Sequence, residues 1–179
     1  MASAISTASS LAVTSESAMS PASEGGGNGA GRPDAGASGA RPRPHDDPQV
    51  RVRVFMIRRG APARVVAAGL EGLIQEWERI GRDVADGYPL DTLEDYLNDM
   101  DVRNLIHDAV AEVPEALDAA MRARLDDADR ALRAQLLPAT ECLWGAEQAA
   151  REGWNARERW WYFMRPARPG PGLSEALGL

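Results

Sequence analysis

The strongest structural signal in the chain is the stretch ARVVAAGLEGLIQEWERIGRDVAD, residues 63–86. Its apolar positions recur at the period of a helix, at Leu70, Leu73, Ile74, Trp77, Ile80, Gly81 and Val84. The acidic side chains lie off this stripe, so the pattern predicts an amphipathic helix that packs one face into a core. Gly87 and Pro89 favour an end to the helix directly after residue 86.

Residues 92–112 carry a second helical pattern, which begins at the sequence Asp91-Thr-Leu-Glu94. Asp91 can accept hydrogen bonds from the first backbone N–H groups, and Glu94 occupies the third helical position, so this sequence predicts a capping box. Asp101 is a second candidate cap. The segment is therefore expected to form either one bent helix or two short helices.

Two later segments are also expected to be helical. Pro114 fits the first turn of a helix whose apolar positions continue to Leu136, and Pro138 stops it. A short helix at 141–152 is expected to end at Gly153. Together these patterns predict three to five helices.

Two short segments have the pattern of strands. Between residues 50 and 58 valines alternate with arginines, so Val50, Val52 and Val54 would share one face of a strand. The aromatic run at 159–165 is the other candidate. A lone strand leaves its backbone hydrogen-bonding groups unpaired, so we expect these two segments to pair as a two-stranded ribbon on a helical layer.

Both ends of the chain lack the large apolar side chains that a core needs. Residues 1–48 are rich in Ala, Ser, Gly and Pro, and residues 167–179 contain Pro169-Gly-Pro-Gly. We expect a disordered N-terminal tail at 1–48 and a flexible C-terminal tail at 167–179. Residues 49–166 are expected to form a single, mainly α domain of the small α+β class, in which three to five helices pack with the two-stranded β ribbon.

The sequence favours a location in the cytoplasm and no contact with a membrane. It contains no stretch of 18 apolar residues, and its N-terminus lacks the basic and apolar segments of a secretory signal. The single cysteine, Cys142, cannot form an internal disulfide. These features are typical of proteins of the reducing cytoplasm.

Acidic charge is concentrated in the middle of the chain. The net charge of −7 divides into +3 for residues 1–66, −11 for residues 69–121 and +1 for residues 122–179. All 20 basic residues are arginine, which a GC-rich coding bias explains. The central excess of carboxylates is the most distinctive chemical feature of the sequence.

Several of these carboxylates are expected to gather on one helix face, because three of the aspartates are spaced by four residues. One interpretation is a solvated helix face, and the other is a surface that attracts and selects a basic partner. We predict a non-enzymatic acidic protein-binding domain with an aromatic anchor, in its sharpest form an immunity- or antitoxin-like inhibitor of a basic toxin or nuclease. The predicted partner-binding residues are Asp91, Asp95, Asp99, Asp101, Trp160 and Trp161.

Other classes of function have weaker support. A carboxylate- or metal-dependent enzyme needs two or more of these acids to converge in a pocket, and the chain has no metal-loop, phosphate-loop or nucleophile motif. His107 and Cys142 are the remaining candidates for chemistry, and we expect no catalytic residue, no bound metal and no cofactor. The net charge disfavours nucleic acid as a partner. A structural, oligomer-forming subunit with an aromatic contact face stays an alternative.

Overall fold

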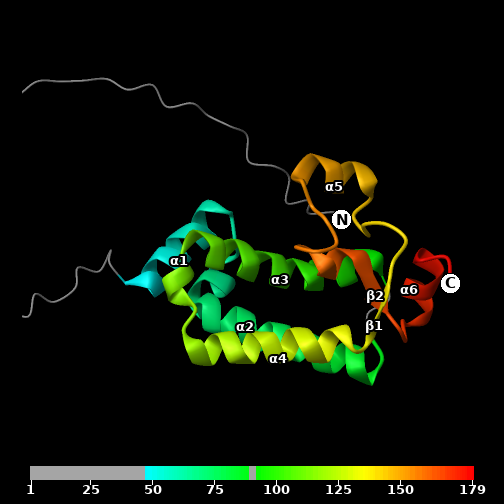
Figure 1. Ribbon diagram of the computed structural model, residues 1–179, viewed down its shortest axis with the longest axis horizontal. Helices are drawn as coiled ribbons and strands as arrows, with labels where there is room; N and C mark the ends of the chain where they lie inside the picture. The colour runs from blue at the N-terminus through cyan, green and yellow to red at the C-terminus, as the bar shows by residue number, and fades with distance from the viewer. Residues whose placement is uncertain (1–46, 89–91) are drawn as a thin grey trace, which may run out of the picture. The chain divides into compact units, whose positions relative to one another are not determined.

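The computed structural model describes residues 47–88 and 92–179, which form a mainly helical unit with one small antiparallel sheet (Figure 1). Its α-helices are α1 (Pro48–Arg58), α2 (Ala63–Asp86), α3 (Leu93–Glu112), α4 (Ala119–Arg133), α5 (Ala146–Glu152) and α6 (Pro171–Ala176). Two 3₁₀ turns are η2 (Pro114–Ala116) and η3 (Trp160–Phe163), and the strands are β1 (Leu136–Pro138) and β2 (Met164–Pro166). The predicted mainly α fold with a two-stranded ribbon is confirmed, with six α-helices in the described ranges where three to five were expected.

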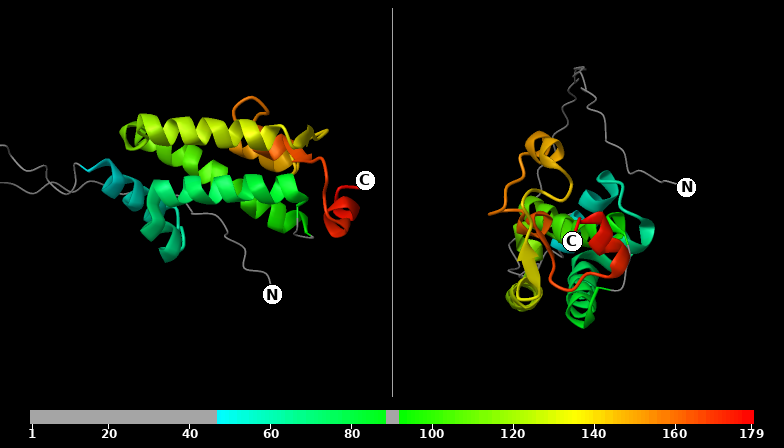
Figure 2. Two further views of the ribbon diagram at one scale, coloured as in Figure 1. Left: turned by 90° about the horizontal axis from the view of Figure 1, so that it is seen from below. Right: turned by 90° about the vertical axis from the view of Figure 1, so that its right-hand side faces the viewer.

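Helix α2 is the centre of the core. Its predicted apolar stripe is confirmed, because the large side chains of that stripe are all buried. The helix packs against α1, α3 and α4, and it runs lengthwise beside α3 and α4 (Figures 1 and 2). Gly69 interrupts its helical geometry with a φ of 64°, a conformation that glycine adopts without the steric strain of other residues.

Different elements lie at the two ends of this helical layer. At one end α1 and η2 pack together, beside the start of α2 and the end of α3 (Figure 1). At the other end β1, β2 and α6 lie near the start of α3 (Figures 1 and 2). None of the helices at 47–88 and 92–179 is long and apolar enough to span a membrane.

The segment predicted as the first strand is instead helix α1. Asp47 caps this helix, because its side chain accepts a hydrogen bond from the Gln49 backbone N–H at 2.8 Å. Val52 and Met56, one helical turn apart, are fully buried, whereas Val54 is exposed. The strand prediction was wrong because a short alternation of valine and arginine also fits a helix that carries apolar side chains on both its buried and its exposed face.

The two-stranded sheet has a different first strand from the predicted one. β1 pairs antiparallel with β2, with Leu137 opposite Arg165, and residues 50–58 take no part because they are helical. Only Met164 and Arg165 of the predicted strand at 159–165 are extended, since the aromatic residues before them form η3. Packing of three aromatic side chains into the core has overridden the preference of such residues for strands.

Helix α3 is one continuous helix rather than two short ones, because no glycine or proline interrupts residues 93–112. Thr92 caps it, its hydroxyl oxygen accepting from the Asp95 backbone N–H at 3.0 Å. Asp91, the predicted cap, lies outside the described residues. Asp101 lies in the interior of the helix and caps no second segment.

Helix α4 begins later than predicted. Pro114 opens η2, and the α4 cap is Asp118, which accepts from the Met121 backbone N–H at 2.8 Å. The predicted helix before Gly153 is confirmed in the shorter α5, and Gly153 ends it in the left-handed conformation. Aspartate is a stronger helix cap than the residues around Pro114, so it fixes the start of α4.

The C-terminal segment is partly ordered, although it was expected to be a flexible tail. Residues 167–179 contain α6, whose Leu173 is fully buried. Arg168 donates a hydrogen bond to the Ala85 carbonyl near the end of α2. Pro171 occupies the first turn of α6, a position that proline favours, so the Pro-Gly sequence begins a helix here. The predicted N-terminal tail lies outside the described residues, except for residues 47 and 48.

Candidate functional site

The predicted acidic site lies on the first half of α3, residues 93–102, which we call the acidic half of α3. It contains no basic residue and four carboxylates, on Glu94, Asp95, Asp99 and Asp101. Glu94 is exposed, and the three aspartates are half-buried. Glu94 and Asp95 lie in the first helical turn, where negative charge interacts favourably with the helix dipole.

Asp95 and Asp99 share one face of α3, as their spacing predicts. The Thr92 hydroxyl donates to the Asp95 carboxylate at 2.6 Å, and its oxygen accepts from the Asp95 backbone N–H. The Tyr88 hydroxyl donates to the Asp99 carboxylate at 2.8 Å. Both carboxylates are therefore oriented by neutral hydroxyl groups, which leave their negative charge in place.

Acidic groups of α2 extend this face. Burial raises the pKa of the Asp99 carboxyl, and the negative charges of Glu76 and Asp83 add to that rise. The Tyr88 hydroxyl and the positive charge of Arg79 act in the opposite direction. Arg79 forms ion pairs with both Glu76 and Asp83. One arginine thus lies among three carboxylates, and the face keeps a net negative charge.

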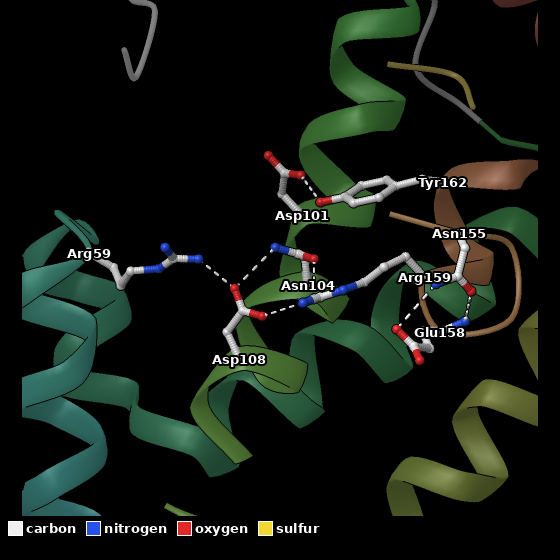
Figure 3. A network of polar contacts seen from close by, with 8 residues as sticks. All are labelled: Arg59, Asp101, Asn104, Asp108, Asn155, Glu158, Arg159 and Tyr162. Atoms are coloured by element: carbon white, nitrogen blue, oxygen red, sulfur yellow. Dashed lines mark hydrogen bonds and ion pairs between the residues drawn. The ribbon is translucent and has the colours of Figure 1, made fainter. Parts of the chain in front are cut away.

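Asp101 lies on the opposite side of α3, because two residues correspond to a rotation of roughly 200° around a helix axis. Its carboxylate accepts a hydrogen bond from the Tyr162 hydroxyl of η3 at 2.5 Å (Figure 3). Burial raises the pKa of the Asp101 carboxyl, and hydrogen bonds from Tyr162 and Trp144 partly offset the rise. Asp101 therefore holds the C-terminal segment on α3 and lies apart from Asp95 and Asp99.

Both tryptophans predicted as aromatic anchors are buried. Trp160 is 6% exposed and Trp161 is 1% exposed. The Trp160 ring packs edge-on against Trp77 at a centroid distance of 6.3 Å, and the Arg133 guanidinium lies over it at 4.1 Å. Neither ring is accessible to a partner. Among the tryptophans in the described ranges, Trp144 is the exposed one, at 36%.

A second polar cluster, which the sequence pattern does not reveal, is centred on Asp108 (Figure 3). Asp108 accepts hydrogen bonds from Arg59 at the end of α1, at 2.5 Å, and from Arg159 before η3, at 2.8 Å. Arg159 also donates to the side-chain oxygen of Asn104 at 2.5 Å. Asn104 and Asp108 are one helical turn apart on α3, so together they join α1 to the C-terminal segment. The spacing of four between Asn104 and Asp108 is the one part of this cluster that the sequence could have indicated, because the two arginines are about fifty residues away from Asp108 along the chain.

An open cleft of about 430 Å³ lies beside the Asp108 cluster. Its walls include the charged groups of Arg59, Asp108 and Arg159 and the rings of Phe55 and Trp154. Both guanidinium groups already bind Asp108. None of the predicted site aspartates in the described ranges lines this cleft.

Of the other residues with possible chemistry, Cys142 is buried and His107 is half-buried. Cys142 is 3% exposed, and burial raises the pKa of its thiol, which makes it a poor nucleophile. His107 is half-buried against Trp161 with ring centroids 5.8 Å apart, and burial lowers its pKa. Within residues 47–88 and 92–179, no three His, Cys, Asp or Glu side chains gather closely enough to hold a metal ion.

Comparison with known proteins adds no functional information. No protein-family model, curated protein or solved structure matches this chain. Its function has to be inferred from its own residues.

Proposed function

We propose that this chain is a non-enzymatic protein-binding domain whose acidic half of α3 engages a basic partner. One observation carries the proposal. Within the described residues, no arginine forms an ion pair with Glu94, Asp95 or Asp99. The second half of the same helix differs, because Asp108 pairs with two arginines.

The contrast with α2 supports this choice of face. Glu71 and Glu78 on α2 share Arg124 of α4, and this hydrogen-bonded arginine lowers the pKa of both carboxyl groups. Carboxylates one helical turn apart repel each other by a few tenths of a kcal/mol when no cation lies between them. Asp95 and Asp99 keep this repulsion, which a basic partner would relieve.

The proposed contact surface has a defined extent. It consists of Glu94, Asp95 and Asp99, bordered by Glu76 and Asp83 of α2. Asp101 and the two buried tryptophans are not part of it. A like-signed surface of this kind accelerates association with a partner of opposite charge and disfavours partners of the same charge.

An inhibitor of a basic toxin or nuclease is one form of this proposal. Such a partner binds phosphate groups with a cluster of basic side chains, and those side chains would meet the carboxylates of α3 in the same way. The surface charge is the feature that supports this form.

The test is affinity capture with the full chain as bait. We expect the wild-type protein to retain a basic partner from native lysate and to release it at high salt, because exposed charge pairs are screened. The double variant Asp95→Arg/Asp99→Arg is expected to lose this partner. The double variant Asp126→Arg/Asp127→Arg makes the same change of charge on the exposed face of α4 and is expected to retain it.

Two results would contradict the proposal. One is capture that is the same for wild type and for the α3 variant. The other is capture that is lost equally in the α3 and α4 variants, which would mean that the partner responds to overall charge instead of the acidic half of α3.

A further inference from the structure

Helix α1 presents a stripe of apolar side chains to solvent. Val54 is 39% exposed and Ile57 is 62% exposed, and Val50, one turn before Val54, is half-buried. These residues follow the helical spacing i, i+4, i+7, so they form one continuous stripe. The opposite face of α1 contributes Val52 and Met56 to the core. We call the outer face the α1 stripe.

Arginines border the α1 stripe on both sides. At about 100° per residue, Arg51 and Arg58 lie on one side of it and Arg53 on the other. Arg51 pairs with Glu115, whereas Arg53 and Arg58 form no ion pair within the described residues. The stripe therefore combines exposed apolar area with uncompensated positive charge.

The opposite end of the helical layer has the complementary composition. The acidic half of α3 lies at that end, together with β1 and α6 (Figure 1). Leu137 in β1 is 42% exposed, and Leu179, three residues after α6, is 60% exposed. Each end thus carries exposed apolar side chains. Unpaired arginines border those of α1, whereas the acidic half of α3 lies at the other end, where Arg165 is opposite Leu137 in the sheet.

We infer that the occupant of the α1 stripe is a second copy of this chain, which presents its acidic half of α3. This inference rests on the proposed function, because it uses the same acidic face and names its partner. A contact between two α1 stripes would bring arginines together and would be repulsive. An anionic membrane surface would repel a chain of net charge −7.

The two contacting surfaces differ and lie at opposite ends, so the contact is head-to-tail. A heterologous contact of this kind repeats from one copy to the next and does not close as a two-fold dimer. The apolar stripe is narrow, so charge pairs provide much of the attraction, and the assembly is weak and sensitive to salt.

Sedimentation equilibrium of the full chain tests the inference. The weight-average mass of the wild type is expected to rise with protein concentration. It should fall when salt increases from about 0.1 M to about 1 M, because the Debye length shortens from about 10 Å to about 3 Å. Both Ile57→Glu/Arg58→Glu and Asp95→Arg/Asp99→Arg are expected to weaken the association at least about tenfold. Ile57 and Arg58 are exposed and Asp95 and Asp99 are half-buried, so circular dichroism checks that each variant is folded.

Mixing the two variants provides the decisive comparison. The Asp95→Arg/Asp99→Arg chain keeps its α1 stripe and the Ile57→Glu/Arg58→Glu chain keeps its acidic half of α3, so the pair retains one intact interface. We expect the mixture to associate although each variant alone does not, because one interface is that of the wild type and the reversed charges on the two altered faces are also opposite in sign. The matched control, Arg122→Glu/Ala123→Glu on the exposed face of α4, is expected to assemble like wild type.

A wild-type chain that stays monomeric at every concentration would overturn the inference, and so would a mixture that stays monomeric while the wild type assembles.

Binding of an oligo-arginine peptide distinguishes a wrong choice of partner from a wrong proposed function. If the peptide binds wild type but not Asp95→Arg/Asp99→Arg while no self-association occurs, only the choice of partner is wrong. If the peptide does not bind wild type either, the proposed function is wrong as well.

Discussion

Asp129 of α4 accepts hydrogen bonds from side chains of two other helices. The Trp77 indole N–H of α2 donates to it at 2.8 Å, and the Arg103 guanidinium of α3 donates through Nε at 2.9 Å and Nη2 at 2.8 Å. The Arg103 and Asp129 side chains are 13% and 17% exposed, so solvent screens this pair much less than a surface pair. One carboxylate thereby fixes the relative positions of α2, α3 and α4.

Replacement of Asp129 by alanine is expected to lower the free energy of unfolding by about 2–4 kcal/mol, since it leaves an indole N–H and a mostly buried guanidinium without their partner. Urea denaturation measures the change. Asp127→Ala is the control, because Asp127 is 70% exposed and pairs with the equally exposed Arg130. It should cost less than about 1 kcal/mol. Equal losses in the two variants would show that the Asp129 cluster contributes no more than a surface pair.

Asp101 is expected to make the stability of the fold depend on pH in a defined direction. Burial raises the pKa of its carboxyl in the folded chain above the unfolded value, so its contribution to stability is complete below the unfolded pKa and is lost as the pH rises through the folded pKa. Asp101→Asn stays neutral and still offers an oxygen to Tyr162. Relative to wild type, this variant is expected to gain stability as the pH rises from about 3 to about 7.

Unfolding midpoints in urea, measured across this pH range, test whether Asp101→Asn gains or loses stability relative to wild type as the pH rises. Glu71→Gln is the matched comparison, because the hydrogen bond from Arg124 lowers the pKa of Glu71. A lowered pKa contributes stability that is present above the unfolded pKa and is lost on acidification, so this variant should lose stability relative to wild type as the pH rises. A constant difference between Asp101→Asn and wild type would contradict the burial of that carboxylate.

At the scale of single elements, substitutions in α1 test whether this segment is a helix or a strand. Val52 and Val54 would share one face of a strand, but in the helix Val52 is fully buried and Val54 is 39% exposed. Val52→Asp is therefore expected to cost more than about 2 kcal/mol, because it places an unpaired carboxylate in the core. Val54→Asp should change stability by less than about 0.5 kcal/mol. Similar losses in thermal or urea unfolding would favour the strand.

The elements also show which parts of the fold a sequence can predict. Helix α2 is predictable because seven positions over four turns follow one period, and all of them except Gly81 are buried. The α1 segment is not, because its alternation is short and its apolar residues occupy two faces. The strand that pairs with β2 cannot be predicted from local patterns either. β1 has only three residues, and it is extended because it pairs with β2.

The candidate site was predictable to a similar degree. The spacing of Asp95 and Asp99 correctly places both on one face of α3. Asp101 was predicted to belong to the same surface, but it lies on another side of α3, where its carboxylate accepts a hydrogen bond from Tyr162. Burial of Trp160 and Trp161 and the pairing of Asp108 depend on contacts between segments that are about fifty residues apart, and no periodic pattern encodes those contacts.

At the scale of the whole molecule, arginines join several helices through ion pairs but form none with Glu94, Asp95 or Asp99 in the described residues. Arg124 joins α2 to α4, Arg59 and Arg159 join α1 and the C-terminal segment to α3, and Arg103 joins α3 to α4. Unpaired negative charge is present at the start of α3, and unpaired positive charge is present on the outer side of α1.

The central claim is that the acidic half of α3 attracts basic groups more strongly than the other exposed carboxylates do. It can be tested by NMR titration of the isotope-labelled full chain with an oligo-arginine peptide at low salt. We expect the largest amide shift changes at residues 93–102, and small changes around Asp126 and Asp127, which lie near Arg122 and Arg130. Shift changes spread evenly over all exposed carboxylates, or concentrated on α4, would contradict the claim.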